Sequence, residues 1–131
     1  MRQALGGFEV KTWDETPCAG ESALRLTRAS ATARVHGMLE GDALMEFLMM
    51  YRDDGTASYV GLHRITGQLG GRAGTFAIQE RGVFDGTTSH GEWTVVSGSG
   101  TNELAGLRGS GSAKAKSPTE SMYHLDYELA S

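Results

Sequence analysis

Two residues of this sequence, His63 and Glu80, are of the types that move protons near neutral pH. Both occupy positions that the alternation of side chains assigns to an otherwise apolar interior. In a dry interior an imidazole and a carboxylate alter each other's pKa, so that one of them can serve as a general acid or base. The pair therefore predicts proton-transfer chemistry such as isomerisation or cyclisation. The competing interpretation is structural: the two groups satisfy each other, or lie in water at a rim.

Aromatic and apolar residues on the same predicted face could form a pocket beside this pair. Tyrosines there would offer hydroxyl groups, although buried aromatic residues more often serve packing. The ligand of such a pocket would be a small hydrophobic molecule. The residues expected to bind it are Phe47, Met49, Tyr51, Tyr59, Ile78, Trp93, Tyr123 and Tyr127.

Motifs for other chemistries are weak. The four histidines, at positions 36, 63, 90 and 124, are too dispersed for a recognisable metal motif. The segment 98–101 lacks the spacing of a phosphate-binding loop, and the segment 109–112 lacks the strand-turn-helix context of a serine nucleophile. The sequence therefore predicts neither a metal nor a cofactor.

The strands that must position the His-Glu pair are predicted from turn signals. Hairpin turns are expected at Asp53-Asp54-Gly55, Gly70-Gly71 and Asp85-Gly86, with a further turn at Leu39-Glu40-Gly41 that folds 24–38 onto 43–51. The run 43–51 contains many good helix formers, which favours a short helix. It is short, however, lacks a clear helix C-cap and ends at a hairpin turn, so we predict a strand.

Turns also fix which residues face each other across a hairpin. The Gly-Gly turn places His63 opposite Ile78, and the Asp-Gly turn places Ile78 opposite Trp93. In this register Glu80 lies diagonally from His63 on the same face, within reach of long side chains. The two residues could therefore form a pair inside the sheet.

The two ends of the chain also alternate like strands. Tyr123, Leu125 and Tyr127 alternate with polar residues near the C-terminus, and Phe8 and Val10 do so near the start. Pairing of the first and last strands would remove free edges by closing the sheet. We therefore predict an all-β fold: a single domain over residues 1–131, built as a small antiparallel β-barrel of about seven or eight strands.

The outward face of this sheet carries more apolar surface than a small monomer normally leaves wet. Its apolar residues are Leu44, Leu48, Met50, Val60, Leu62 and Val83. Among its charged residues, Arg34 is expected near Glu46 as an exposed ion pair. The apolar face predicts a homo-oligomer, with a dimer favoured.

Composition limits the partners and the compartment. The net charge is −4 with Lys and Arg scattered singly, which gives no footprint for nucleic acid or an anionic membrane. The start lacks a signal-peptide core, and no segment has the length of apolar sequence that a membrane-spanning helix needs. The single cysteine, Cys18, cannot form an internal disulfide. A cytoplasmic protein without nucleic-acid or membrane partners is expected.

Four segments carry a resemblance that extends over nearly the whole chain. They are FEVKTWD (8–14), LTRAS (26–30), YRDDGTASYVGL (51–62) and GSGTNELAGLRG (98–109). The chain resembles a bacterial family of unknown function, common in actinobacteria, whose members are similar to allene oxide cyclase and dirigent proteins in forming a small antiparallel β-barrel. In the pattern of that family Glu stands at the position of His63 and His at the position of Glu80, so the resemblance implies an exchanged pair.

The resemblance implies a ligand-holding barrel and, by analogy, cofactor-independent cyclase or isomerase activity on a hydrophobic or polyketide-like metabolite. In that mechanism His63 and Glu80 would share a proton and pass it to or from the substrate. The alternative is a non-catalytic ligand carrier, or a structural oligomer whose barrel is packed solid. The volume of the interior distinguishes these possibilities.

Overall fold

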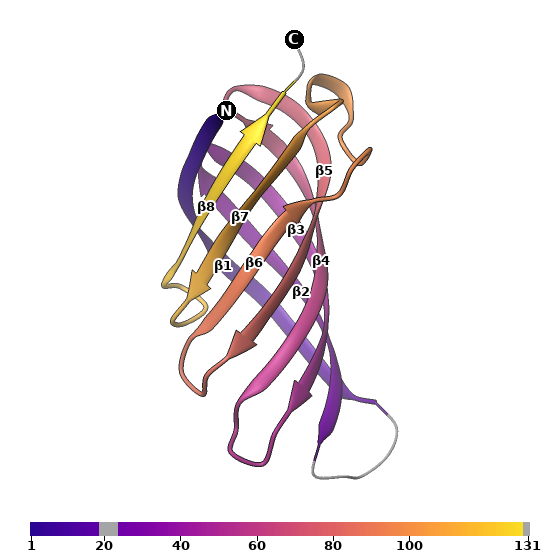
Figure 1. Cartoon of the computed structure of the whole chain (residues 1–131), viewed down its shortest axis with the longest axis vertical. Helices are drawn as coiled ribbons and strands as arrows, with labels where there is room; N and C mark the ends of the chain where they lie inside the picture. The colour runs from indigo at the N-terminus through magenta and orange to yellow at the C-terminus, as the bar shows by residue number, and fades with distance from the viewer. Residues whose placement is uncertain (19–23, 130–131) are drawn as a thin grey trace.

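The computed structural model describes residues 1–18 and 24–129, and its strands close in chain order into one antiparallel eight-stranded barrel (Figure 1). The strands are β1 (Arg2–Pro17), β2 (Arg25–Gly37), β3 (Leu39–Tyr51), β4 (Ala57–Leu69), β5 (Arg72–Phe84), β6 (Ser89–Val95), β7 (Arg108–Ala115) and β8 (Ser121–Glu128). Closure comes from pairing of β1 with β8. The predicted all-β barrel is confirmed, and the segment 43–51 is a strand despite its helix formers, because its side chains alternate between core and solvent.

The β4–β5 hairpin has the predicted register. Gly70 and Gly71 both have positive φ, 58° and 84°, as a two-residue type I′ turn requires. His63 consequently pairs with Ile78. The turn thus fixes the register of β4, which carries His63, against β5, which carries Glu80.

The β5–β6 register differs from the prediction by two residues. The turn is not a two-residue Asp-Gly turn, because the strands resume only at Ser89 and the Asp85 carboxylate accepts hydrogen bonds from the backbone N–H groups of Thr87 and Thr88. Trp93 therefore pairs with Glu80 and not with Ile78, although it keeps its inward orientation.

The turn expected at Leu39-Glu40-Gly41 is also wrong. Those residues begin β3, and the chain turns at Met38 instead. The difference moves the pairing of β2 with β3 by four residues, so Arg34 pairs with Asp42. It forms ion pairs with Asp42 and Glu40, each at 3.3 Å, and not with Glu46.

An irregularity in β1 changes which of its side chains face inward. Phe8 and Val10 face the interior, but the register against β2 shifts between Val10 and Thr12, as in a β-bulge. Beyond the bulge the inward positions are Trp13 and Glu15, which pair with buried alanines of β2. In β1 the even-numbered residues therefore face the interior before the bulge, and the odd-numbered residues face it after the bulge.

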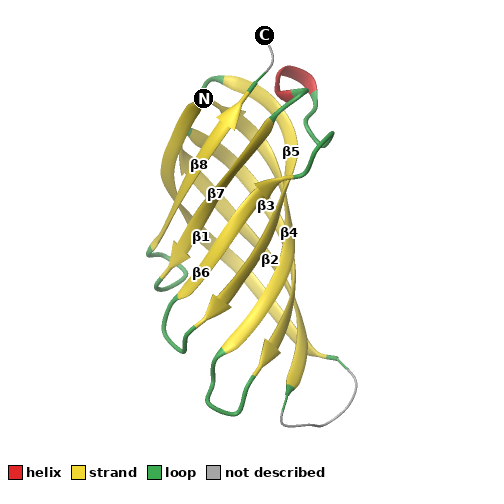
Figure 2. Cartoon of the chain, in the orientation of Figure 1, coloured by secondary structure: helices red, strands yellow, loops and turns green. Residues whose placement is uncertain are grey.

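One end of the barrel is closed by the long link between β6 and β7. This link includes the short helical turn η1 (Asn102–Leu104), drawn in red in Figure 2. Leu104 and Leu107 from the link are fully buried. At the same end the Tyr123 hydroxyl accepts a hydrogen bond from the backbone N–H of Leu39 at 2.9 Å. This end is packed with side chains.

Within the described part of the chain, no helix is long and apolar enough to cross a membrane.

Candidate acid-base site in the barrel cavity

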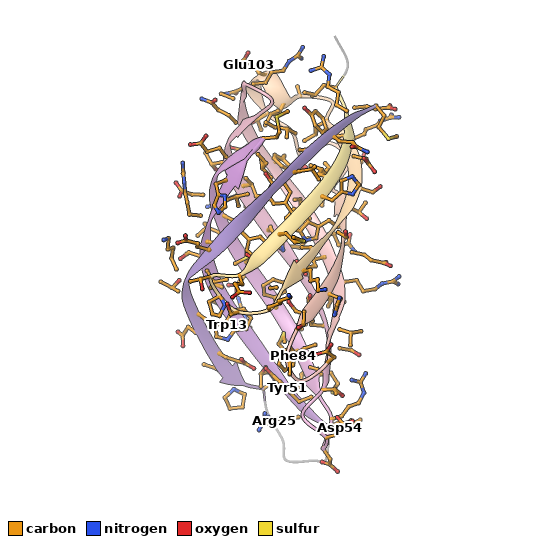
Figure 3. All side chains as sticks on the ribbon, turned by 90° about the vertical axis from the view of Figure 1, so that its left-hand side faces the viewer. Trp13, Arg25, Tyr51, Asp54, Phe84 and Glu103 are labelled. Atoms are coloured by element: carbon orange, nitrogen blue, oxygen red, sulfur yellow. The ribbon has the colours of Figure 1, made fainter. Side chains whose placement is uncertain are left out.

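A cavity of about 380 Å³ occupies the half of the barrel away from the closed end. This is within the usual size range of small-molecule sites. Its walls come from β1, β3, β4 and β5 with one end each of β6 and β7, and its rim includes the turns at 85–88 and 116–120. Figure 3 shows Trp13, Tyr51 and Phe84 toward this end, far from Glu103 of the closed end. The barrel is therefore solid at one end and hollow at the other.

His63 of β4 and Glu80 of β5 meet on the wall of this cavity. Nε2 of the imidazole lies 2.7 Å from Oε1 of the carboxylate. The two residues are 4% and 6% exposed, so the contact is almost fully removed from water. The predicted juxtaposition is present, and its distance is that of a charge-assisted hydrogen bond.

The Glu80 carboxylate receives two further hydrogen bonds. The hydroxyl of Tyr59 donates to Oε2 at 2.7 Å, and the indole Nε1 of Trp93 donates to Oε1 at 3.0 Å. Burial by itself raises the pKa of Glu80, but the hydrogen bond and the electrostatic attraction of His63, with the hydrogen bonds from Tyr59 and Trp93, outweigh it and lower the pKa below its ordinary value of 4.5. Glu80 is therefore a carboxylate at neutral pH.

An ionised carboxylate determines the tautomer of the imidazole. Because Glu80 can only accept hydrogen bonds, the proton between the two groups belongs to Nε2 of His63. Glu80 is the only hydrogen-bond partner of the ring among residues 1–18 and 24–129. In neutral His63 the other nitrogen, Nδ1, keeps a free lone pair, and the ring lines the cavity. This arrangement is that of a general base oriented by a carboxylate.

Aromatic rings hold the imidazole from two sides. Phe47 and Trp93 contact it edge-to-face, with centroid distances of 5.5 and 5.4 Å. The same carboxylate that orients His63 also anchors Trp93. The ring of His63 is consequently fixed by packing as well as by its hydrogen bond.

Inward-facing glycines make room for the polar network. A Cβ at Gly91 would lie 2.0 Å from Oε2 of Glu80, and a Cβ at Gly82 would lie 2.5 Å from the hydroxyl oxygen of Tyr59. At Gly91 the three nearest atoms all belong to the Glu80 side chain. The absence of a side chain on β6 at this position is thus a condition for the carboxylate to lie where it does.

Replacement of Gly91 by alanine is expected to displace the Glu80 carboxylate and destabilise the protein by about 1–3 kcal/mol, the usual cost of overpacking. The measurement is urea unfolding of the wild type, Gly91→Ala, Glu80→Ala and the double variant. The added methyl should cost much less in the Glu80→Ala background, because the side chain that it strikes is gone. Equal costs in both backgrounds would contradict the assignment.

A second polar group lies at the rim of the cavity around Glu15. Its carboxylate accepts hydrogen bonds from Thr27 Oγ1 at 2.6 Å and from Trp13 Nε1 at 2.9 Å. Burial raises the pKa of Glu15, but the hydrogen bonds from Thr27, Trp13 and Tyr51, with the nearby Arg25, lower it overall. Burial and the Glu15 carboxylate in turn raise the pKa of Tyr51 to about 12. Trp13 and Tyr51 are therefore both neutral hydrogen-bond donors to Glu15 at physiological pH.

The structure gathers only part of the predicted site. Phe47, Met49, Tyr51 and Tyr59 line the cavity together with His63 and Glu80. The remaining four predicted residues lie in the solid part of the barrel and do not line this cavity: Ile78, Trp93, Tyr123 and Tyr127. Among these, Trp93 contacts the site through Glu80, and Tyr123 stacks on Trp93 at 5.7 Å.

Several lining residues were not predicted. They are Phe8, Val10, Trp13, Glu15, Met45, Phe84, Thr87, Ser89, Ala115, Lys116, Ser117 and Pro118. Simple alternation from Phe8 and Val10 places Trp13 outside, and only the bulge turns it inward, where it stacks on Phe47 at 5.9 Å. For Thr87 the sequence signal was the predicted turn at Asp85-Gly86, which did not indicate which end of the barrel is hollow. The turn that contains Lys116, Ser117 and Pro118 was not predicted.

Among the described residues, no group of three or more His, Cys, Asp or Glu side chains could hold a metal ion. The family model "Protein of unknown function (DUF3224)" matches residues 4–127. The chain is similar to the crystal structure of a DUF3224 protein with unknown function from Shewanella oneidensis MR-1, with a TM-score of 0.79 and 26% identity. That match covers 100% of this chain and 98% of the other. No curated protein matches.

Proposed function

Because the chain belongs to the DUF3224 family, whose function is unknown, we propose that its barrel binds a small apolar molecule and acts on it through His63 as a general base. The observation that carries this proposal is the buried carboxylate of Glu80, which takes up Nε2–H of His63 and leaves Nδ1 free on a wall of the cavity. A histidine used only for structure would not need a basic nitrogen on the wall of a largely apolar cavity.

The reaction class is proton transfer within the bound molecule. Nδ1 of His63 removes a proton from an acidic position, and the resulting imidazolium is stabilised by the adjacent Glu80 carboxylate. The imidazolium then gives a proton to another atom of the delocalised anion, which completes an isomerisation without a net gain or loss of protons. In this scheme Glu80, Tyr59 and Trp93 are positioning residues, and no cofactor takes part. Cyclase chemistry, as in the allene oxide cyclase-like barrels that the sequence resembles, is the finer form of this proposal.

Binding is tested with N-phenyl-1-naphthylamine, a neutral dye whose emission rises in apolar surroundings. We expect saturable binding to the wild type, and its loss in Ala115→Trp, because Ala115 lines the cavity and an indole there would fill it. The matched control is Ala73→Trp, at an exposed position of β5 outside the cavity. If the wild type does not bind, or if Ala115→Trp binds as well as Ala73→Trp, the cavity is not a ligand site.

The second candidate function is a ligand carrier without catalysis. It is favoured by the small number of polar groups in the deep part of the cavity, where the acid-base pair is the main exception. A carrier would bind the same ligands after loss of the basic nitrogen, whereas an enzyme would lose turnover. Loss of proton transfer in His63→Gln, with binding retained, would separate an enzyme from a carrier.

A further inference from the structure

We propose that the ligand of this cavity is a weak acid that delocalises its own negative charge, such as a phenol or the enol of a 1,3-dicarbonyl compound. This inference rests on the proposed function of the cavity and specifies its substrate class. It follows from which hydrogen-bonding capacities remain free beside His63.

The deep end of the cavity offers an acceptor and no free donor. The Tyr59 hydroxyl, the Trp93 indole N–H and the His63 Nε2–H all donate to the Glu80 carboxylate. Each of these groups has a single proton to donate, so none remains for a ligand. The free position is the lone pair on Nδ1 of neutral His63. A ligand atom placed there must therefore donate a proton.

The surroundings of His63 do not stabilise an anion by other means. Its neighbours on the cavity wall are the ring of Phe47 and the side chain of Met45, which pairs with it across the β3–β4 ladder. The other polar lining residues of the described chain lie at the rim or at strand ends: Glu15, Thr87, Ser89, Lys116 and Ser117. Without an oxyanion hole, a localised alkoxide or simple enolate would be costly here. An anion whose charge spreads over a conjugated system avoids that cost.

The charge balance of the pair supports the same class. Proton transfer from the ligand to Nδ1 gives an imidazolium between the Glu80 carboxylate and the ligand anion. The cation is then flanked by two anions in an apolar wall, so the ligand anion is paired as it forms. A ligand without an acidic proton gains nothing from this arrangement.

The test compares 4-nitrophenol with 4-nitroanisole, which has a similar shape but no acidic proton. We expect 4-nitrophenol to bind about tenfold or more tightly, as a hydrogen bond to a charged group predicts, and its visible anion band to appear on binding below the pH at which it ionises in water. In His63→Gln, which keeps an N–H donor for Glu80, the band should disappear. His124→Gln, at a partly exposed position on β8, is the matched control.

The outcomes separate the two levels of the proposal. Equal affinities for the two compounds, or an unchanged anion band in His63→Gln, would overturn the substrate class while leaving the cavity as a binding site. If neither compound binds, the proposed function itself is overturned, and the substrate class with it.

A different observation supports a second inference: we propose that the outer face of β2–β5 joins two copies of this chain. The apolar residues of this face are about half exposed: Leu26, Leu44, Leu48, Met50, Val60, Leu62 and Val83. They adjoin one another across the strands, since Leu48 pairs with Val60 and Leu26 with Met50. Five of them also line a groove on the outside of the barrel: Leu26, Leu48, Met50, Val60 and Val83.

The charges on this face favour a second copy over a charged partner. They balance in number: Arg28, Arg34, Arg64 and Arg81 are matched by Glu40, Asp42 and Glu46 and by Glu92 of the adjoining β6. Most of them form ion pairs, such as Arg28 with Glu46 at 2.7 Å and Arg81 with Glu92 at 3.3 Å. Such a surface has no net charge to attract an acidic or a basic partner, although the chain as a whole carries −4. In a two-fold symmetric contact each pair can meet its own equivalent with opposite charges matched.

The measurement is the molar mass in solution by size-exclusion chromatography with light scattering. We expect a dimer for the wild type and a monomer for Leu48→Glu and for Val60→Lys. Met122→Glu, at an exposed position on β8 away from this face, should remain dimeric. A monomeric wild type, or a dimer that Leu48→Glu and Val60→Lys do not dissociate, would overturn this inference without affecting that on the ligand.

Discussion

Replacing Glu80 by alanine is expected to lower the free energy of unfolding by about 3–5 kcal/mol, because each buried donor left without an acceptor costs about 1–3 kcal/mol. The carboxylate accepts hydrogen bonds from His63, Tyr59 and Trp93, so its loss leaves three donors unpaired in the interior. Urea unfolding followed by tryptophan fluorescence measures the effect.

The matched control for this substitution is Glu92→Ala. Glu92 is an exposed glutamate that forms an ion pair with Arg81 on the outer face, and its removal should cost about 0.5 kcal/mol or less. If Glu80→Ala costs no more than Glu92→Ala, the Glu80 network does not hold the interior together.

The contribution of Glu80 should also depend on pH. Its pKa is lower in the folded chain than the ordinary value of 4.5, so the ionised form is the one that folding stabilises. That stabilisation is fully present above the ordinary pKa and is lost as the pH falls through the folded pKa. The difference in unfolding free energy between the wild type and Glu80→Gln should therefore shrink on acidification. A difference that is constant over that range would contradict an ionised Glu80.

Replacing His63 by glutamine is expected to slow proton transfer on a bound ligand by about 10²–10⁴-fold, the usual contribution of a general base. The probe is 1-phenylbutane-1,3-dione in D₂O, whose acidic C–H exchanges for deuterium when it ionises. Nδ1 of His63 takes the proton, the imidazolium N–H exchanges with D₂O, and Nδ1 then returns a deuteron to the same carbon. Exchange is followed by proton NMR at equal protein concentrations.

Two controls keep this experiment interpretable. Circular dichroism and urea unfolding establish that His63→Gln is folded, which we expect because glutamine can still donate to Glu80. His124→Gln removes a histidine from the outside of the barrel and should exchange the probe at the wild-type rate. Equal rates in all three proteins would leave a carrier as the better description of the cavity.

The sequence predicted the fold well because barrel strands leave two signals in a sequence: alternating apolar and polar residues, and turn residues between the strands. In β3 the alternating pattern overrode the helix formers, and the two adjacent glycines fixed the His63–Ile78 register. The expected membership in a family of unknown function is likewise confirmed. A register error of two residues leaves each side chain on the same face of the sheet. Trp93 was therefore placed on the correct face but opposite the wrong partner.

The candidate site was less predictable because it depends on features without a local sequence signal. The bulge of β1 that turns Trp13 and Glu15 inward is set by pairing with β2, not by the composition of β1. The hydrogen bond from Trp93 to Glu80 required a register that the four-residue turn after Phe84 had displaced. Which end of the barrel is hollow follows from where the β6–β7 link folds, and alternation is the same at both ends.

The two ends of the barrel differ in what their residues do: one end supplies packing and stability, and the other forms the cavity. In many small domains the same residues must do both. The closed end holds the link that contains η1 and a dense set of buried side chains, whereas the rim of the cavity is formed in part by the turns at 85–88 and 116–120. The length and sequence of these turns can be changed without altering the residues of the packed end. A library randomised there would vary the entrance of the cavity on a scaffold whose stability is supplied elsewhere, with the His63–Glu80 pair unchanged.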